Sequence, residues 1–163
     1  MAHGNQLVRV SLLLSQNYHA SFLQKCPSFT RMNGDPCSGL QWHGVECSWR
    51  GTVSSLELKN NNLKGKIPPT IGDFSDLDGT FLLQGGVSGT IPSSLGKLTK
   101  MTNLGLNQNS FVGTLPTELA RLTNLVDFEI AGNGGASAGL GGPLPSELAR
   151  LTALSTFQVK MWG

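Results

Sequence analysis

The most constraining feature of this sequence is a repeat of 24 residues. Pro68, Pro92 and Pro116 are each 24 positions apart, and leucine, asparagine and glycine recur with them at fixed offsets. The third copy, Asn103–Pro116, reads NLGLNQNSFVGTLP. The equivalent residues are Leu56, Leu58, Asn61, Leu63, Gly65 and Ile67 in the first copy, and Leu82, Val87, Gly89 and Ile91 in the second. Because several unlike residue types repeat together, the pattern predicts a solenoid of stacked units.

The repeats divide the chain into a cap region and an array. We expect residues 1–52 to form an N-terminal helix and cap, and residues 53–163 to form the array. The predicted units are 53–76, 77–100, 101–124 and 125–153, with a partial unit at 154–163. The fourth unit is longer because Gly134–Ala138 (GGASA) is inserted. We interpret this insert as a tolerated surface insertion, with a contact loop beside the strands as the alternative.

Each unit has the pattern of one turn of a coil. The Leu-x-Leu motif at Leu104 and Leu106 predicts a short strand whose leucines point inward, and such strands stack as a parallel ribbon on the concave side. Asn109 then turns the chain inward, and its amide can satisfy backbone groups of neighbouring turns. Asn61 and Asn133 are its equivalents.

The convex return of each unit begins at an Ile-Pro or Leu-Pro pair. Apolar residues three positions apart follow, which predicts a short 3₁₀ or helical turn. These pairs are Ile71/Phe74, Leu95/Leu98, Leu119/Leu122 and Leu148/Leu151. The predicted fold class is therefore an α/β solenoid, a right-handed curved coil with a parallel β-ribbon on its concave face.

Composition and motifs argue against several classes of function. Charged residues make up 13% of the chain and the formal net charge is +2, without a basic run that would bind a nucleic-acid backbone. No apolar run reaches the ~18 residues that a membrane span needs. Catalytic motifs such as G-x-S-x-G, the P-loop and H-E-x-x-H are missing from the sequence. We therefore predict a non-enzymatic protein without a cofactor.

The residues before the array contain the cysteines. Cys37 and Cys47 flank Trp42, and a disulfide between them that closes a short cap loop is the leading hypothesis. Cys26 is then a free thiol, unless it pairs with one of the other two. A sharper alternative is a zinc site made by Cys26, Cys37, His43 and Cys47, although this spacing lacks a C-x2-C knuckle. We predict no metal.

An apolar stretch near the N-terminus has two interpretations. Leu7–Leu14 (LVRVSLLL) follows the first methionine as a short signal sequence would, but Arg9 interrupts it and no small-x-small cleavage site follows. The favoured interpretation is a cap helix with an apolar face of Leu7, Val10 and Leu14. A signal peptide is thus not convincingly present.

The repeat pattern resembles the plant-type leucine-rich repeats of receptor-like kinases, receptor-like proteins and polygalacturonase-inhibitor-type proteins. The resemblance covers Asp35–Gly163. Asp35-Pro36-Cys37 with Trp42-x-Gly44-Val45-x-Cys47 resembles the N-terminal cap of that family, which implies that the two cysteines pair. The family also implies an extracellular or cell-surface, often receptor-linked module that binds a protein or peptide. From the charge and the apolar run lengths given above, we expect neither nucleic-acid binding nor direct membrane insertion by this segment.

The resemblance leaves other functions open. The alternatives are a structural or assembly module of the cell surface and an inhibitor of a cell-wall-degrading enzyme. No C-terminal cap follows Gly163, so we expect the chain to be a fragment of a longer array or the product of an incomplete gene model. The resemblance allows a membrane span or a kinase domain in the parent, and the sequence shows neither. The uncapped end also predicts a surface for self-association.

The predicted binding surface is the concave face, where outward residues alternate with the leucines. Counting in steps of 24 places Phe81 and Leu83 among them, as two apolar side chains facing solvent and a hot spot for a ligand. The alternative is a change of register in repeat two that turns Phe81 into the core in place of Thr80. The predicted ligand-binding residues are Glu57, Lys59, Phe81, Leu83, Asn107, Glu129, Gln158 and Lys160.

Overall fold

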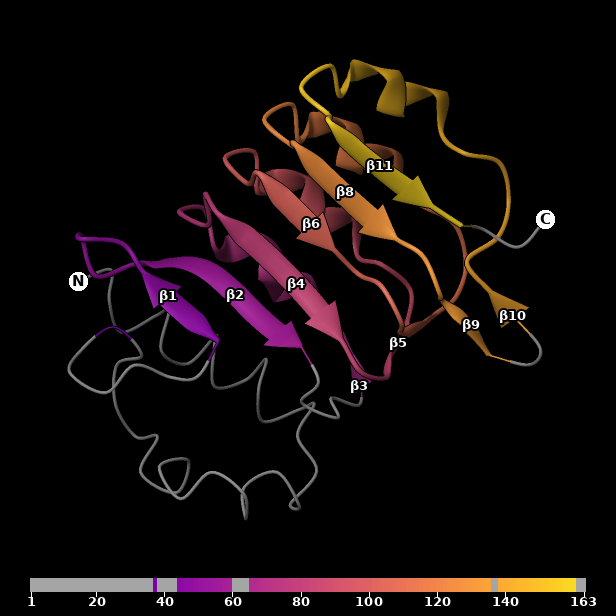
Figure 1. Ribbon diagram of the computed structural model, residues 1–163, viewed down its shortest axis with the longest axis horizontal. Coiled ribbons are helices and arrows are strands. Elements are labelled where there is room, and N and C mark those ends of the chain that lie inside the picture. The colour runs from indigo at the N-terminus through magenta and orange to yellow at the C-terminus, as the bar shows by residue number, and fades with distance from the viewer. Residues whose placement is uncertain (1–36, 38–43, 60–64, 136–137, 161–163) are drawn as a thin grey trace, which may run out of the picture.

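The computed structural model of the protein describes residues 37, 44–59, 65–135 and 138–160. These residues form a curved solenoid whose strands lie side by side along one face (Figure 1). The main sheet has the order β1-β2-β4-β6-β8-β11. Its strands are β1 (Val45–Cys47), β2 (Val53–Lys59), β4 (Thr80–Gln84), β6 (Asn103–Gly105), β8 (Asp127–Ile130) and β11 (Thr156–Val159).

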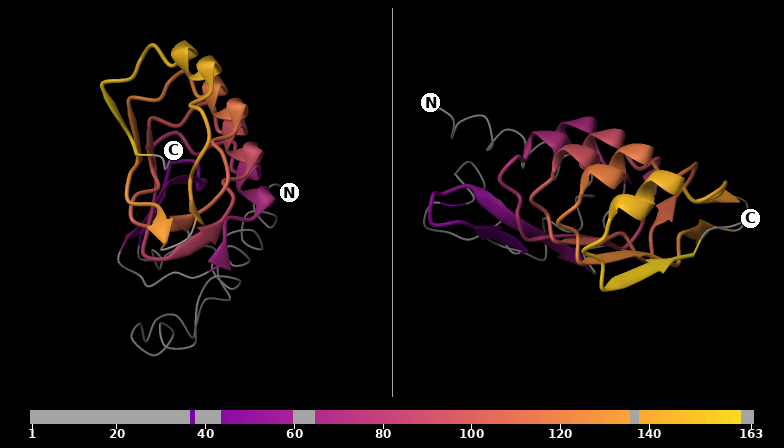
Figure 2. Two further views of the ribbon diagram at one scale, coloured as in Figure 1. Left: turned by 90° about the vertical axis from the view of Figure 1, so that its right-hand side faces the viewer. Right: turned by 90° about the horizontal axis from the view of Figure 1, so that it is seen from above.

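Neighbouring strands of the repeats are parallel, and only β1 runs antiparallel to its neighbour β2. A short 3₁₀ helix follows β2, β4, β6 and β8 in their repeats, on the opposite, convex side (Figure 2). These helices are η2 (Pro69–Asp73), η3 (Ser93–Lys97), η4 (Thr117–Arg121) and η5 (Ser146–Arg150). The predicted fold class, with its concave ribbon and short convex turns, is confirmed.

The core lies between the ribbon and the 3₁₀ helices. Phe74, Leu98 and Leu122 pack from the convex side, and Leu104 and Phe128 pack from the strands, all with at most 1% of their surface exposed. Every turn therefore depends on its neighbours for burial, as expected for a stacked repeat.

The buried asparagines form the predicted ladder. The Asn109 amide donates to the carbonyl of Leu83 in the preceding repeat at 2.7 Å. Asn133 donates to the carbonyl of Leu106 at the same distance. Because both side chains are at most 5% exposed, each amide satisfies a backbone group that water does not reach. Asn61 lies outside the described residues.

Smaller sheets lie at the carboxyl ends of the main strands. One joins β3 (Gly65–Lys66), β5 (Val87–Gly89) and β7 (Ser110–Phe111). The insert of repeat four contributes an antiparallel pair, β9 (Gly134–Gly135) and β10 (Ala138–Gly139). Figure 1 places this pair along the same edge of the main sheet as β3 and β5, at the carboxyl ends of its strands.

Repeat two departs from the predicted strand register. Within the sheet, Phe81 lies beside Leu56 and Leu83 lies beside Leu58. On the other side, Phe81 lies beside Leu104. Phe81 is 0% exposed and Leu83 is 3% exposed. The prediction that these two side chains form an exposed hot spot is therefore wrong, and the alternative that placed Phe81 in the core is correct.

One extra residue precedes the strand in repeat two. Phe81 follows the buried Leu77 by four positions, whereas Leu104 follows the equivalent Met101 by three. The insertion buries Phe81 and leaves Thr80 partly exposed at the groove. Burying a large apolar side chain stabilises by ~1.5–3 kcal/mol, and burying an unpaired hydroxyl is unfavourable, so burial favours the shifted register.

One residue is missing after the same strand. Val87 follows Leu83 by four positions, whereas Phe111 follows Leu106 by five. The shorter connection contains Gly85–Gly86, with φ values of 134° and 119°. Residues with a Cβ rarely adopt these angles, so the glycine pair allows a turn that other residues would resist. The gain and the loss cancel, which preserves the 24-residue spacing of the prolines.

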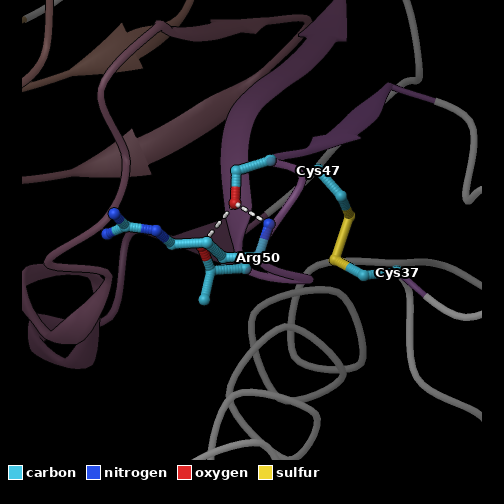
Figure 3. The surroundings of a disulfide bond; sticks show 5 residues. Cys37, Cys47 and Arg50 are labelled. Carbon is cyan, nitrogen blue, oxygen red and sulfur yellow. Dashed lines mark hydrogen bonds between the residues drawn. A yellow bond between two sulfur atoms is a disulfide. The ribbon is translucent and has the colours of Figure 1, made fainter.

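A disulfide joins Cys37 to Cys47 of β1, with the two Cα atoms 5.6 Å apart (Figure 3). It confirms the leading hypothesis for the cap and uses two of the four ligands of the zinc alternative. Closing a loop of this length stabilises by about 2–3 kcal/mol on the chain-entropy model. The predicted helix at Leu7–Leu14 and the residues Cys26, Trp42 and His43 lie outside the described part of the chain. The helices that are described are all too short to cross a lipid bilayer.

Candidate functional site

A groove of about 440 Å³ crosses the concave sheet over β2, β4, β6 and β8. We call it the concave groove. Its lining residues are Glu57, Lys59, Thr80, Leu82, Leu83, Gln84, Asn103, Leu104, Gly105, Asn107, Gln108, Asp127 and Glu129. They come from four successive repeats, so the stacking of the repeats builds the groove.

Leu82 and Gly105 form the centre of the groove. They lie side by side on β4 and β6, in the row that also contains Glu57 and Glu129. A Cβ at Gly105 would lie 2.2 Å from Cδ2 of Leu82, so the leucine side chain extends over the glycine. Leu82 is partly exposed. The centre is therefore apolar and shallow, because Gly105 contributes no side chain there.

Two carboxylates mark the β8 end of the groove. The Asn103 amide donates to Asp127, and the Asn107 amide donates to Oε2 of Glu129 at 2.6 Å. The Asn107 side-chain oxygen also accepts from the Ala131 N–H at 2.7 Å, which fixes the amide between the two repeats. Because each carboxylate is held from the preceding repeat, both are pre-oriented on the concave face.

The β2 end of the groove carries one charge of each sign. Glu57 and Lys59 are both exposed and lie two positions apart, on the same face of β2. Among the described residues, no ion pair involves Glu57, Lys59, Asp127 or Glu129. The groove lining therefore has three carboxylates and one ammonium group, with its excess negative charge at the β8 end.

The rim of the groove contains a residue in an uncommon backbone conformation. Gln108 has φ of 53°, in the left-handed region, and is the only such non-glycine residue in the described chain. Its side chain accepts a hydrogen bond from the Gln84 amide. Gly132, one repeat later, has φ of 71°. The geometry of the turn favours glycine, but repeat three places a side chain there that contacts repeat two.

The predicted binding residues fall into three groups. Glu57, Lys59, Asn107 and Glu129 line the groove. Leu83 borders it but is buried, and Phe81 lies wholly in the core. Gln158 and Lys160, on and just after β11, are exposed on the next repeat and do not line the groove.

Sequence reasoning missed other lining residues, chiefly Leu82, Gln84 and Asn103. Leu82 and Gln84 were missed because the repeat spacing places repeat two one residue out of register. The signal that could have found them is local: Thr80 is polar at a leucine position, and Gly85–Gly86 replaces the ladder asparagine.

Comparisons with known proteins agree with this architecture. The Leucine Rich Repeat family model matches residues 52–74. A probable leucine-rich repeat receptor-like protein kinase of Arabidopsis thaliana is 44% identical over 45 residues, which is 28% of this chain and 5% of that protein. The matched segment thus represents a small part of the kinase.

Two solved structures extend the likeness to most of the chain. The crystal structure of PEPR1–AtPEP1 matches with a TM-score of 0.72 and 28% identity, covering 93% of this chain and 21% of that one. The leucine-rich repeat ectodomain of the receptor kinase SOBIR1 from Arabidopsis thaliana matches with a TM-score of 0.62 and 25% identity, covering 86% of this chain and 77% of that one. Together with the repeat geometry described above, these likenesses show that the chain is a leucine-rich repeat solenoid similar to plant leucine-rich repeat receptor ectodomains.

Proposed function

We propose that this chain is a non-enzymatic binding module that holds a protein or peptide segment in the concave groove. The observation that carries the proposal is the groove itself, where an apolar centre is bordered by hydrogen-bonded polar side chains from several repeats. Such a surface has many orientable donors and acceptors, together with an apolar contact for a side chain. Glu57 and Glu129 lie three strands apart, about 14 Å, which favours separate ligand contacts over an acid/base pair.

We further propose that the module is part of an extracellular, receptor-like protein. The SOBIR1 match is an ectodomain of a receptor kinase, and the PEPR1 match is a complex with AtPEP1. The Cys37–Cys47 disulfide supports an oxidising compartment, because disulfides persist in secreted and surface proteins. Labelling intact cells with an antibody to this chain tests the location. Staining only after permeabilisation would contradict it.

The residues proposed to contact the ligand are revised by the strand register. Glu57, Lys59, Asn107 and Glu129 are kept from the sequence prediction. Leu82, Asn103 and Asp127 are added because they line the same groove. Gln158 and Lys160 stay as candidates for a ligand that extends beyond the groove onto β11.

Selection from a random peptide display library on the full chain tests the proposed function. Each selected peptide is then measured against Gly105→Val, which places a side chain in the centre of the groove and displaces Leu82. The matched control is Thr123→Val, at an exposed position outside the groove. We expect the selected peptides to lose affinity for Gly105→Val and to keep it for Thr123→Val, with both variants showing the circular dichroism spectrum of the wild type. Peptides indifferent to Gly105→Val would overturn the concave groove as the binding site.

Assembly is the second candidate function, and an apolar surface beyond the groove favours it. Leu144 and Phe157 are 46% and 43% exposed, and they border a groove of about 410 Å³ together with Leu148 and Leu154. Self-association through this surface is tested by sedimentation equilibrium of the wild type and of Phe157→Ser. A dimer lost in the variant supports assembly, and a monomeric wild type at high concentration rules it out.

A further inference from the structure

If the concave groove binds a peptide, as proposed above, its charges and the spacing of its strands select which peptide binds. We propose that its ligand is an extended segment in which an apolar residue is followed or preceded, two positions away, by arginine or lysine. The apolar side chain lies over Leu82 and Gly105, and the cationic side chain lies between Asp127 and Glu129.

Charge is the first argument for this ligand. Asp127 and Glu129 are two positions apart on β8 and therefore point to the same face. Neither carboxylate makes an ion pair within the described residues, and their hydrogen-bond donors, Asn103 and Asn107, are neutral. Two oriented carboxylates without a cationic partner on the same face attract an arginine or lysine and repel an acidic segment.

The gap at Gly105 is the second argument. Gly105 is buried even though it stands at an outward position of its strand, because the partly exposed side chain of Leu82 extends over it. A ligand side chain placed there contacts the leucine methyl groups that cover the β6 backbone. In the same row, Glu57 lies beside Leu82 and Glu129 lies beside Gly105, so the two glutamates border the Leu82–Gly105 pair on its two sides.

Spacing connects the two arguments. Neighbouring strands lie about 4.8 Å apart, so the Leu82–Gly105 midpoint is about 7 Å from the Glu129 strand. In an extended peptide that crosses the strands, residues two apart point to the same side and are separated by about 6.8 Å. The intervening residue points away from the sheet and is left unspecified.

A second cationic residue in the ligand, two positions beyond its apolar residue on the other side, adds less to the binding affinity. The two cationic residues are four positions apart in the peptide, or about 14 Å, which is also the distance from β8 to β2. The second cationic residue therefore lies near Glu57. Lys59 lies on the same face as Glu57 and offsets its charge. We therefore assign the main selection to Asp127 and Glu129. The contacts named here involve only side chains of the ligand, so the peptide can run across the strands in either direction.

The experiment has two readouts on the full chain. The first is the sequence of library peptides whose binding depends on Gly105. Enrichment of arginine or lysine two positions from an apolar residue supports the inference. Groove-dependent peptides without that pattern overturn it and leave the proposed function intact, whereas the absence of any groove-dependent peptide overturns both.

The second readout is the affinity of a synthetic peptide, Gly-Ser-Arg-Ser-Leu-Ser-Arg-Ser-Gly, whose core reads the same in both directions. Replacing Asp127→Asn and Glu129→Gln together should weaken its binding about tenfold, since two partly exposed charge pairs are lost. The control, Glu118→Gln with Glu147→Gln, removes the same charge from the convex helices η4 and η5. Equal losses in both double variants, or equal binding of a peptide with glutamate in place of arginine, would overturn the inference.

Discussion

Repeats two and three are adjacent turns of one solenoid with the same proline spacing, yet their strands differ in register. In repeat three the inward residues of the strand follow the 24-residue count, and Leu104 is buried as expected. In repeat two the same count selects Thr80, and the structure instead buries Phe81. Because strand side chains alternate, a shift of one residue exchanges the whole set of inward and outward positions. Apolar burial, rather than distance from the proline, therefore sets the register of a repeat strand.

The largest expected effect tests this exchange directly. Phe81→Ala should lower the free energy of unfolding by about 3–5 kcal/mol, because a fully buried ring is removed from the core. Leu82→Ala, one position along, should cost less than about 1.5 kcal/mol because Leu82 is partly exposed. Urea unfolding followed by circular dichroism measures both.

The reversed order, with Leu82→Ala the more destabilising, would restore the register that the sequence count predicts. The same pair separates folding from binding. Leu82→Ala should weaken groove-dependent peptides in a chain that stays folded, whereas Phe81→Ala should act on stability first.

The next largest expected loss of stability comes from removing an asparagine of the ladder. Asn109 bonds to the backbone of repeat two and Asn133 to the backbone of repeat three, so the two variants compare these repeats. Asn109 accepts from the N–H groups of Gly86 and Val87, at 3.2 and 3.1 Å, besides donating to Leu83. Within the part of the chain that the structure describes, Asn133 donates to Leu106 and accepts one long bond of 3.5 Å, from Phe111. We expect Asn109→Ala to cost about 2–4 kcal/mol, and more than Asn133→Ala, because it leaves more buried backbone groups unpaired.

Thermal unfolding of the two variants checks this order. A larger loss for Asn133→Ala would mean that the turn of repeat two does not depend on its neighbour's amide.

The sequence predicted the parts of the fold that repeat with the prolines. The prediction failed in repeat two, where one residue is added before the strand and one is missing after it. The 3₁₀ helices η2, η3 and η4 and the buried Asn109 and Asn133 follow the 24-residue spacing, and η5 follows it once the five-residue insert is counted, so counting found them. The centre of the groove does not follow the 24-residue spacing. One extra residue before Phe81 and one missing residue at Gly85–Gly86 cancel, so Pro92 keeps its position. A spacing measured between prolines on the convex side contains no information about such a compensated shift.

The turn after β4 provides a smaller effect. Gly86 has φ of 119°, which residues with a Cβ rarely adopt, whereas Gly132 has φ of 71°, in the ordinary left-handed region. Gly86→Ala should therefore cost about 1–3 kcal/mol, and Gly132→Ala only about 1 kcal/mol. Chemical denaturation of the two variants measures the difference. Equal losses would show that the shortened turn of repeat two carries no more backbone restriction than the regular one.

The smallest expected effect concerns Gln108, the side chain that repeat three places at the left-handed position. Gln108→Gly should raise the free energy of unfolding by about 0.5 kcal/mol, because relief of a left-handed residue, ~1 kcal/mol, outweighs the loss of an exposed hydrogen bond to Gln84. Gln84→Ala removes the hydrogen bond alone and should cost no more than about 0.5 kcal/mol. If Gln108→Gly instead destabilises the chain as much as Gln84→Ala does, the hydrogen bond rather than the backbone determines this position. Both variants can also be tested for their affinity for the groove-dependent peptides, with Thr123→Val as the control. If both lose affinity and the control does not, the contact between Gln84 and Gln108 belongs to the binding surface. The uncommon conformation of Gln108 then serves the groove rather than the fold.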